Sequence, residues 1–491
     1  MKNTLKASML IMMMGIGCVN AQTDIDAFNF SQRSIAGTAR FVAMGGAFCA
    51  TGADISTMSQ NPAGIGLYRK GDITFSPSIF IGNTVSDYLG ETIEDGRTGF
   101  NIGNTGAVFA SDPKSGDAEG WVNWSFGLGY NRLYDFNNLK SFEGFNNTSS
   151  LTDYFAESSK GTSYENLDSY TNYLAYYSYL INPDSLNNYF SVAPGGNVLQ
   201  RRSSETRGGI NELSMTFAGN YMNRLYIGGA IAFTSIRYSE DTYFEEINSQ
   251  NLLDSLTQFG ALRQYTFGQY LDTEGSGVNL KLGLILRASD YVRVGAAIHT
   301  PTWYNMTDAY SNEIQAQYKS GARRGKNSPD GLFDYDFTSP FRATGGFTFL
   351  FEDKGLLSID YEYTDFSQAR FRAPLTSYSQ VNSDIRRNYT STNSLRAGAE
   401  IRIGQLSLRG GYGITTSPMS SGYKVSGNDF SQSRFSGGLG IRDKRFYLDL
   451  AYLYSITNGY YQPYYLENQT VEGVREKITG NNFTLTVGAR F

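Results

Sequence analysis

The chain has 491 residues, a formal net charge of −5, and 54 glycine, 36 tyrosine and 32 phenylalanine residues. A slightly acidic balance offers nothing to a nucleic-acid backbone, so no nucleic-acid partner is expected. The glycine- and aromatic-rich composition, with 40% hydrophobic residues, suits strands in which every second residue faces a polar interior.

Residues 1–21 are predicted to be a signal peptide that is removed on export. Lys2 and Lys6 give a positive start, residues 9–16 form an apolar run, and residues 19–21 read as a small-residue cleavage site. After this segment no apolar run approaches the roughly 20 residues that a membrane helix needs. The chain is therefore either soluble or crosses a membrane as strands.

A lipoprotein signal is the alternative reading, with Cys18 lipidated. Gly15 fits it poorly, because such signals prefer a bulky aliphatic residue there. With Cys18 removed, Cys49 remains alone and cannot form an internal disulfide.

Residues 22–71 do not alternate, and they are rich in small residues. A segment of this length ahead of the first strand either hangs free or folds back into the tube that the later strands form. Small residues favour close packing inside a tube, and Pro62 with Gly64 predicts a fixed turn. We expect residues 22–71 to form a hatch that plugs the lumen.

Fourteen later segments alternate apolar and polar residues, which is the period of a strand with two different faces. In the clearest one, Trp124, Phe126 and Leu128 share a face, and Asn123 and Ser125 share the other. The predicted strands are residues 72–81, 104–111, 121–131, 211–219, 224–236, 276–287, 291–299, 341–351, 356–364, 394–403, 406–413, 435–442, 446–455 and 482–491.

The gaps between these segments alternate short and long. The short ones are polar turns, such as residues 288–290 and 404–405. The longest are residues 132–210, 237–275 and 300–340. Short periplasmic turns and long extracellular loops are typical of outer-membrane barrels, whose outer face contacts lipid. Residues 72–491 are thus predicted to form an all-β, 14-stranded antiparallel transmembrane β-barrel.

Two features are candidate ligand elements. Leu252, Leu256, Phe259 and Leu262 have helical spacing in the loop 237–275, which suggests either a ligand groove or packing against other loops. Gly127 and Gly129 interrupt the third strand and could mark a kink, although glycine is abundant throughout the chain.

The hatch segment resembles that of the FadL/TodX family of outer-membrane transporters for long-chain fatty acids and other hydrophobic compounds. The resembling residues are Gly45-Gly46-Ala47, Asp54 with Ser56, and above all Asn61-Pro62-Ala63-Gly64. The resemblance implies a hatch inside a 14-stranded barrel, with the Asn61 turn belonging to it. It further implies capture at external loops, hatch movement, and sideways release at a kink in the third strand. A purely structural plug turn is the alternative.

These observations predict a monomeric outer-membrane transporter that passes a hydrophobic small molecule, such as a long-chain fatty acid, by diffusion. One alternative is a barrel that carries or docks proteins during secretion to the cell surface. Another is a receptor for haem or a similar ligand, with His299 facing the lumen. A structural protein without transport is the last. A single histidine disfavours a zinc cluster or a hydrolase triad, so no enzyme, metal or cofactor is expected.

Overall fold

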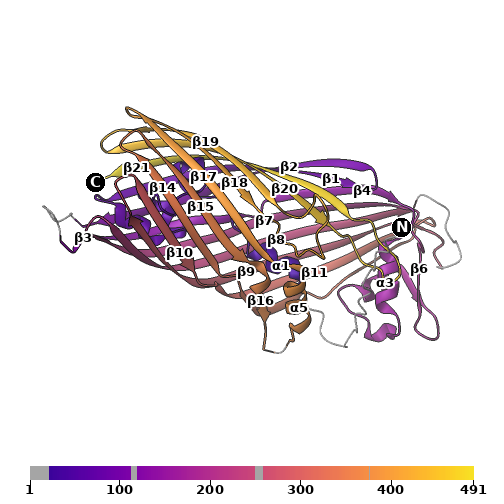
Figure 1. Cartoon of the computed structure of the whole chain (residues 1–491). Coiled ribbons are helices and arrows are strands. Elements are labelled where there is room, and N and C mark those ends of the chain that lie inside the picture. Colours follow the sequence, from indigo (N-terminus) through magenta and orange to yellow (C-terminus); the bar gives the residue numbers. More distant parts are fainter. Residues whose placement is uncertain (1–21, 112–118, 249–257, 375) are drawn as a thin grey trace, which may run out of the picture.

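The computed structural model describes residues 22–111, 119–248, 258–374 and 376–491. The chain forms a closed antiparallel β-barrel of fourteen strands, and the N-terminal segment lies inside the ring of strands (Figure 1). The ring closes where the first strand pairs with the last, from Asp72 opposite Arg490 to Asp87 opposite Arg475. No helix in the described part of the chain is long and apolar enough to cross a membrane.

The wall consists of β1 (Asp72–Tyr88), β2 (Glu91–Ala110), β3 (Trp121–Asp135), β7 (Val198–Tyr221), β8 (Leu225–Asn248), β9 (Leu262–Arg287), β10 (Val292–His299) continued by β11 (Trp303–Tyr318), β13 (Gly331–Thr338) with β14 (Arg342–Phe351), β15 (Gly355–Asp365), β17 (Ser391–Ile403), β18 (Leu406–Thr415), β19 (Gln432–Arg442), β20 (Phe446–Tyr461) and β21 (Val474–Arg490). Each predicted strand coincides with one of these fourteen, so the predicted fold class is confirmed.

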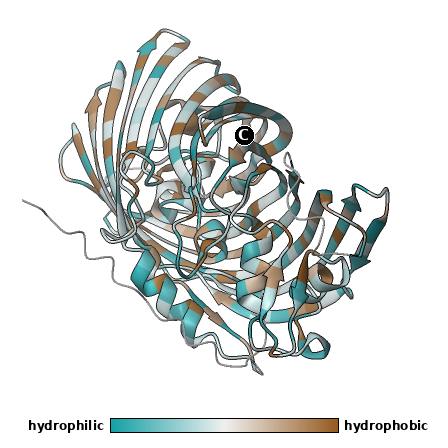
Figure 2. Cartoon of the chain, turned by 90° about the vertical axis from the view of Figure 1, so that its right-hand side faces the viewer, coloured by the Kyte–Doolittle hydropathy of each residue, from teal (hydrophilic) through white to brown (hydrophobic). Residues whose placement is uncertain are grey.

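The strands alternate in hydropathy along their length (Figure 2). In β8, Ile231 and Phe233 point outward and are exposed, whereas Ala232 between them is buried against the lumen. A few residues further along, the polarity inverts: Arg237 is exposed on the outside and Tyr238 is buried inside. An outward apolar stretch followed by outward charge marks where lipid ends and water begins.

This inversion explains why several strands run far beyond their predicted ends. β7, β8 and β9 have 24, 24 and 26 residues, whereas a membrane crossing takes about 9–11. Their extra residues form a sheet above the membrane, with charge outside and aromatic residues inside. The predicted loops 132–210 and 237–275 therefore contain strand ends, and the loop 300–340 contains β11 and β13.

The remaining elements lie in the long connections between the wall strands, at the end of the barrel opposite the short turns. They are β4 (Asn138–Asn146), α3 (Leu151–Ser159), η3 (Tyr164–Asn166), α4 (Asn172–Tyr177), β5 (Ile181–Pro183), β6 (Tyr189–Ser191), β12 (Arg323–Asn327), η4 (Phe366–Gln368), β16 (Arg370–Arg372) and α5 (Ser379–Asn388). Residues 138–191, here called the lid, bury Phe155 and Leu174 against Phe244, Tyr265 and Val474 of the extended wall. The lid therefore packs on the end of the barrel opposite the short turns.

Candidate functional site

Residues 22–71, the predicted hatch, contain four short helices: α1 (Asp24–Phe30), α2 (Ala39–Ala43), η1 (Ile55–Ser59) and η2 (Pro62–Leu67). We call this segment the hatch. α2 contacts β18, β19, β20 and β21, whereas η2 contacts β7, β8 and β9 on another side of the ring. The hatch therefore spans the lumen from wall to wall, near the end where the C-terminus lies (Figure 1).

The predicted turn at Asn61 begins η2 and also joins the hatch to the wall. The Asn61 Oδ1 atom accepts a hydrogen bond from the backbone N–H of Ala63 at 3.1 Å, which caps the helix. Its Nδ2 atom donates to the carbonyl oxygens of Cys49 at 2.6 Å and of Leu284 in β9 at 3.2 Å. Pro62 fits the first helical position because no backbone N–H is needed there.

Inward-facing glycines of the wall let the hatch approach at backbone distance. A Cβ atom on Gly283 would lie 1.9 Å from Asn61 Oδ1, and one on Gly295 would lie 2.2 Å from the Cys49 carbonyl oxygen. On Gly228 it would lie 2.6 Å from the backbone nitrogen of Ala63. These wall glycines are not among the predicted site residues, although their place on the inward face of each strand was a usable signal.

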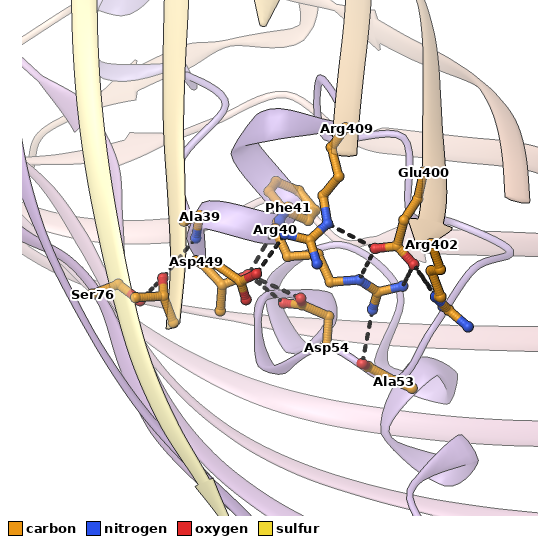
Figure 3. A network of polar contacts seen from close by, with 12 residues as sticks. Ala39, Arg40, Phe41, Ala53, Asp54, Ser76, Glu400, Arg402, Arg409 and Asp449 are labelled. Carbon is orange, nitrogen blue, oxygen red and sulfur yellow. Dashed lines mark hydrogen bonds and ion pairs between the residues drawn. The ribbon is translucent and has the colours of Figure 1, made fainter. Parts of the chain in front are cut away.

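A buried ionic network fastens the hatch to the opposite wall (Figure 3). The Arg40 guanidinium of α2 donates to Glu400 in β17 at 2.8 Å, and Arg409 donates to the same carboxylate at 2.7 Å. Arg402 adds a third contact at 2.6 Å. In the hatch itself, burial raises the pKa of Asp54, and the nearby Arg40 opposes that shift.

A second network holds η1. Lys281 of β9 and Glu212 of β7 form a fully buried ion pair. The Ser59 hydroxyl donates to Glu212 at 2.7 Å, and His299 Nε2 lies 2.8 Å from the Gln60 carbonyl oxygen. His299 thus faces the lumen, as predicted, but its Nε2 atom contacts the hatch. Within the described residues no group of three or more His, Cys, Asp or Glu side chains could hold a metal.

The kink predicted at Gly127 and Gly129 does not coincide with a register shift of β3. These glycines pair regularly with Thr216 and Ser214 of β7, and β3 shifts register elsewhere, between Trp121 and Asn123 and between Arg132 and Tyr134. The glycines instead make room for the hatch. Cβ atoms on Gly127 and Gly129 would lie 2.5 and 2.3 Å from the Met58 side chain.

The register shift of β3 between Arg132 and Tyr134 coincides with a break in the pairing of the wall strands. β2 pairs with β3 only from Asn104 to Ala110, and residues 91–103 of β2 pair with β1 alone among the described residues. Above this point β3 and β4 follow β7 instead. We call this unpaired edge, between residues 91–103 and residues 132–146, the seam. Phe100 lies on it with 72% of its surface exposed.

A cavity of about 130 Å³ lies in the lumen beside the seam. Asn131 and Leu133 of β3 line it, so it adjoins the strand that turns away from β2. The rest of the lining includes neutral polar side chains, four aromatic rings and five charged side chains. The rings are Phe28, Phe41, Phe366 and Phe430, and the charged residues are Arg33, Arg342, Glu362, Arg396 and Arg434. The cavity is thus amphipathic, and its volume is enough for several waters or a small ligand.

The predicted groove in the loop 237–275 is only partly described. Leu252 and Leu256 lie outside the described residues. Leu262 is the first residue of β9, not part of a helix, and is buried in the lid core. The ring of Phe259 packs against that of Tyr179 at 5.0 Å. Phe259 and Leu262, the described residues of the predicted groove, therefore pack in the hydrophobic cluster between the lid and the extended wall.

The fold is a closed β-barrel with the N-terminal segment in its lumen. No family model matches the sequence, and no curated protein matches it either. Solved structures do match over nearly their whole length. A Pseudomonas aeruginosa FadL homologue is 12% identical with a TM-score of 0.55, and the alignment covers 94% of this chain and 99% of that one.

Two further structures have the same fold. The Pseudomonas putida toluene transporter TodX is 13% identical, with a TM-score of 0.54 over 93% of this chain and 99% of its own. The CymD monoaromatic hydrocarbon channel is 12% identical, with a TM-score of 0.51 over 93% and 98%. By name, TodX is a transporter and CymD is a channel.

Proposed function

We propose that this barrel lies in the bacterial outer membrane and passes a hydrophobic small molecule inward by diffusion, releasing it sideways through the seam. The observation that carries the proposal is the position of the cavity. It adjoins β3 where that strand leaves β2, and Phe100 and Ile102 continue an apolar surface from the seam onto the outer face. A sideways exit lets an apolar solute reach lipid without crossing water.

The hatch supports a sideways route over an axial one. It contacts wall backbone at Gly228, Gly283 and Gly295, and two buried ionic networks fasten it. Leaving the barrel along its axis requires breaking these contacts together. Among the described residues no backbone ladder joins the two edges of the seam, and their contacts include the hydrogen bond from Asn101 Nδ2 to Asp135 Oδ2, at 2.8 Å.

A disulfide across the seam tests this route. A Cβ atom on Gly99 would lie 3.8 Å from that of Asn137, which is within disulfide geometry. In a Cys49→Ser background, Gly99→Cys with Asn137→Cys should abolish uptake of a labelled long-chain fatty acid or of toluene. A reducing agent should restore it.

A staple on the other edge of the same strand is the matched control. Gly103→Cys with Ser78→Cys joins β2 to β1, with a Cβ separation of 3.4 Å, and should leave uptake unchanged. Normal uptake with the seam fully cross-linked would rule out sideways release. Loss of uptake with the control staple alone would show that β2 itself must move.

A second pair tests hatch movement. The Cβ atom of a residue at Gly66 would lie 3.5 Å from that of Ala218 in β7. Gly66→Cys with Ala218→Cys should block transport if the hatch must move, and unchanged transport removes the hatch from the mechanism. A deletion strain with normal uptake but missing surface proteins would instead favour the secretion role.

A further inference from the structure

Positive charge in the lumen cavity exceeds negative charge. Four arginines line it, Arg33, Arg342, Arg396 and Arg434, and Glu362 is the one acidic residue in the lining. Glu362 accepts contacts from Arg342 at 3.4 Å and from Arg396 at 2.8 Å. One carboxylate therefore forms ion pairs with two guanidinium groups, and it neutralises the charge of only one.

The other two arginines have no carboxylate of their own. Arg434 donates to the neutral oxygens of Thr415, at 3.0 Å, and of Gln432. No described carboxylate is recorded within ion-pair distance of it. Arg33 lies 4.0 Å from Glu212, which already forms the buried pair with Lys281. Unbalanced charge on buried side chains is costly, which favours an anion as occupant.

Several buried polar atoms around the cavity have no hydrogen-bond partner among the described residues. Arg342 and Arg434 are only 8% and 9% exposed. Within the described residues no hydrogen bond satisfies the Nε–H donor of Arg396, which suits an anion. Gln60 Oε1 and His299 Nδ1 also lack a partner, but the amide oxygen, and the ring nitrogen opposite the Nε2 that faces the Gln60 carbonyl oxygen, are acceptors and suit a water molecule. Buried polar atoms in native proteins normally have partners, so these atoms indicate bound water or ligand.

We infer that the cavity binds a doubly charged oxyanion of the phosphate class. Guanidinium groups match the geometry of phosphate oxygens in paired hydrogen bonds. A monocarboxylate would leave most of the excess charge unmatched, whereas a phosphate group carries about −1.5 to −2 near neutral pH. The oxyanion is either a free ion or the head group of an amphiphile, whose apolar part would face Phe28, Phe41, Phe366 and Phe430. The amphiphile case rests on the proposed function.

Calorimetry on the purified full chain in a non-ionic detergent tests the inference. Dodecyl phosphate should bind more tightly than dodecanoate, and dodecanol should bind least. Affinity for dodecyl phosphate should fall between about pH 8 and about pH 5, because the second phosphate pKa is about 6. Dodecanoate binding as tightly as dodecyl phosphate would overturn the inference, since one charge would then suffice.

Inorganic phosphate separates the two sources. Its binding at the same affinity as dodecyl phosphate means a free ion. Binding only of the alkyl phosphate means a head group. No binding of either refutes the site. These binding measurements involve no transport. Phosphate binding can therefore be absent while uptake is normal, and it can be present while uptake is absent.

Arg434 provides the variant because it has no ion pair whose loss would strand a carboxylate. Arg434→Gln should weaken alkyl phosphate binding by about tenfold or more, the usual effect of losing a charge-assisted hydrogen bond. Arg237→Gln, on the outer face of β8 with 77% of its side chain exposed, should bind like the wild type. Equal affinities in both variants and the wild type would overturn the assignment of Arg434.

Discussion

Replacing Glu400 with glutamine should loosen the hatch, because this carboxylate joins α2 to the wall. Three arginines contact it, and its removal leaves Arg40, whose side chain is 7% exposed, without its wall partner. Removing one member of a buried ion pair costs about 3–5 kcal/mol. We take about 3 kcal/mol for the seated hatch, because Asp54 stays beside Arg40 and offsets part of the loss.

Cys49 supplies the assay. It is fully buried between the hatch and β14–β15, and it is the one cysteine in residues 22–491. A maleimide reaches its thiol only when the hatch opens locally, so the labelling rate follows the opening equilibrium. A loss of about 3 kcal/mol should raise that rate about 100-fold, at 1.4 kcal/mol per factor of ten.

Arg402→Gln is the matched control. The Arg402 side chain is 37% exposed and lies outside the hatch, so its contact with Glu400 is worth less than about 1 kcal/mol. Labelling should then rise no more than about fivefold. The reasoning is refuted if Glu400→Gln labels at the wild-type rate while both proteins react fully when denatured. It is also refuted if the two variants label alike.

Three further changes test other parts of the structure. Gly283→Ala puts a methyl group 1.9 Å from Asn61 Oδ1 and should destabilise the seated hatch by about 1–3 kcal/mol. The effect should be measured as faster Cys49 labelling. Gly229→Ala, whose methyl group has no neighbour nearer than 3.5 Å, should leave the labelling rate unchanged. Phe30→Ala removes a 3% exposed ring and should cost α1 about 3–5 kcal/mol of docking, measured as faster hydrogen exchange over residues 24–31. Leu282→Arg, on the lipid face of β9, should cost about 2–4 kcal/mol of folding into vesicles, and Ser276→Arg much less.

The amino-acid sequence determined the barrel and the number of its strands. Alternation has a period of two, and polar turns such as residues 288–290 and 404–405 are local signals. The strand ends at the short turns were therefore placed within a few residues. The extracellular ends were not, because above the membrane the apolar face turns inward, as Tyr238 of β8 does beside the outward Arg237.

The site depends on contacts that join distant parts of the chain. Asn61 could be assigned to a turn from its neighbours, since a helix cap is local. Its hydrogen bond to the Leu284 carbonyl oxygen joins residues 223 positions apart in the sequence. The hydrogen bond from Arg40 to Glu400 joins residues 360 positions apart. Only closure of the barrel sets those pairs, the seam and the arginine-lined cavity, because each depends on how strands pair in register and no local pattern encodes that.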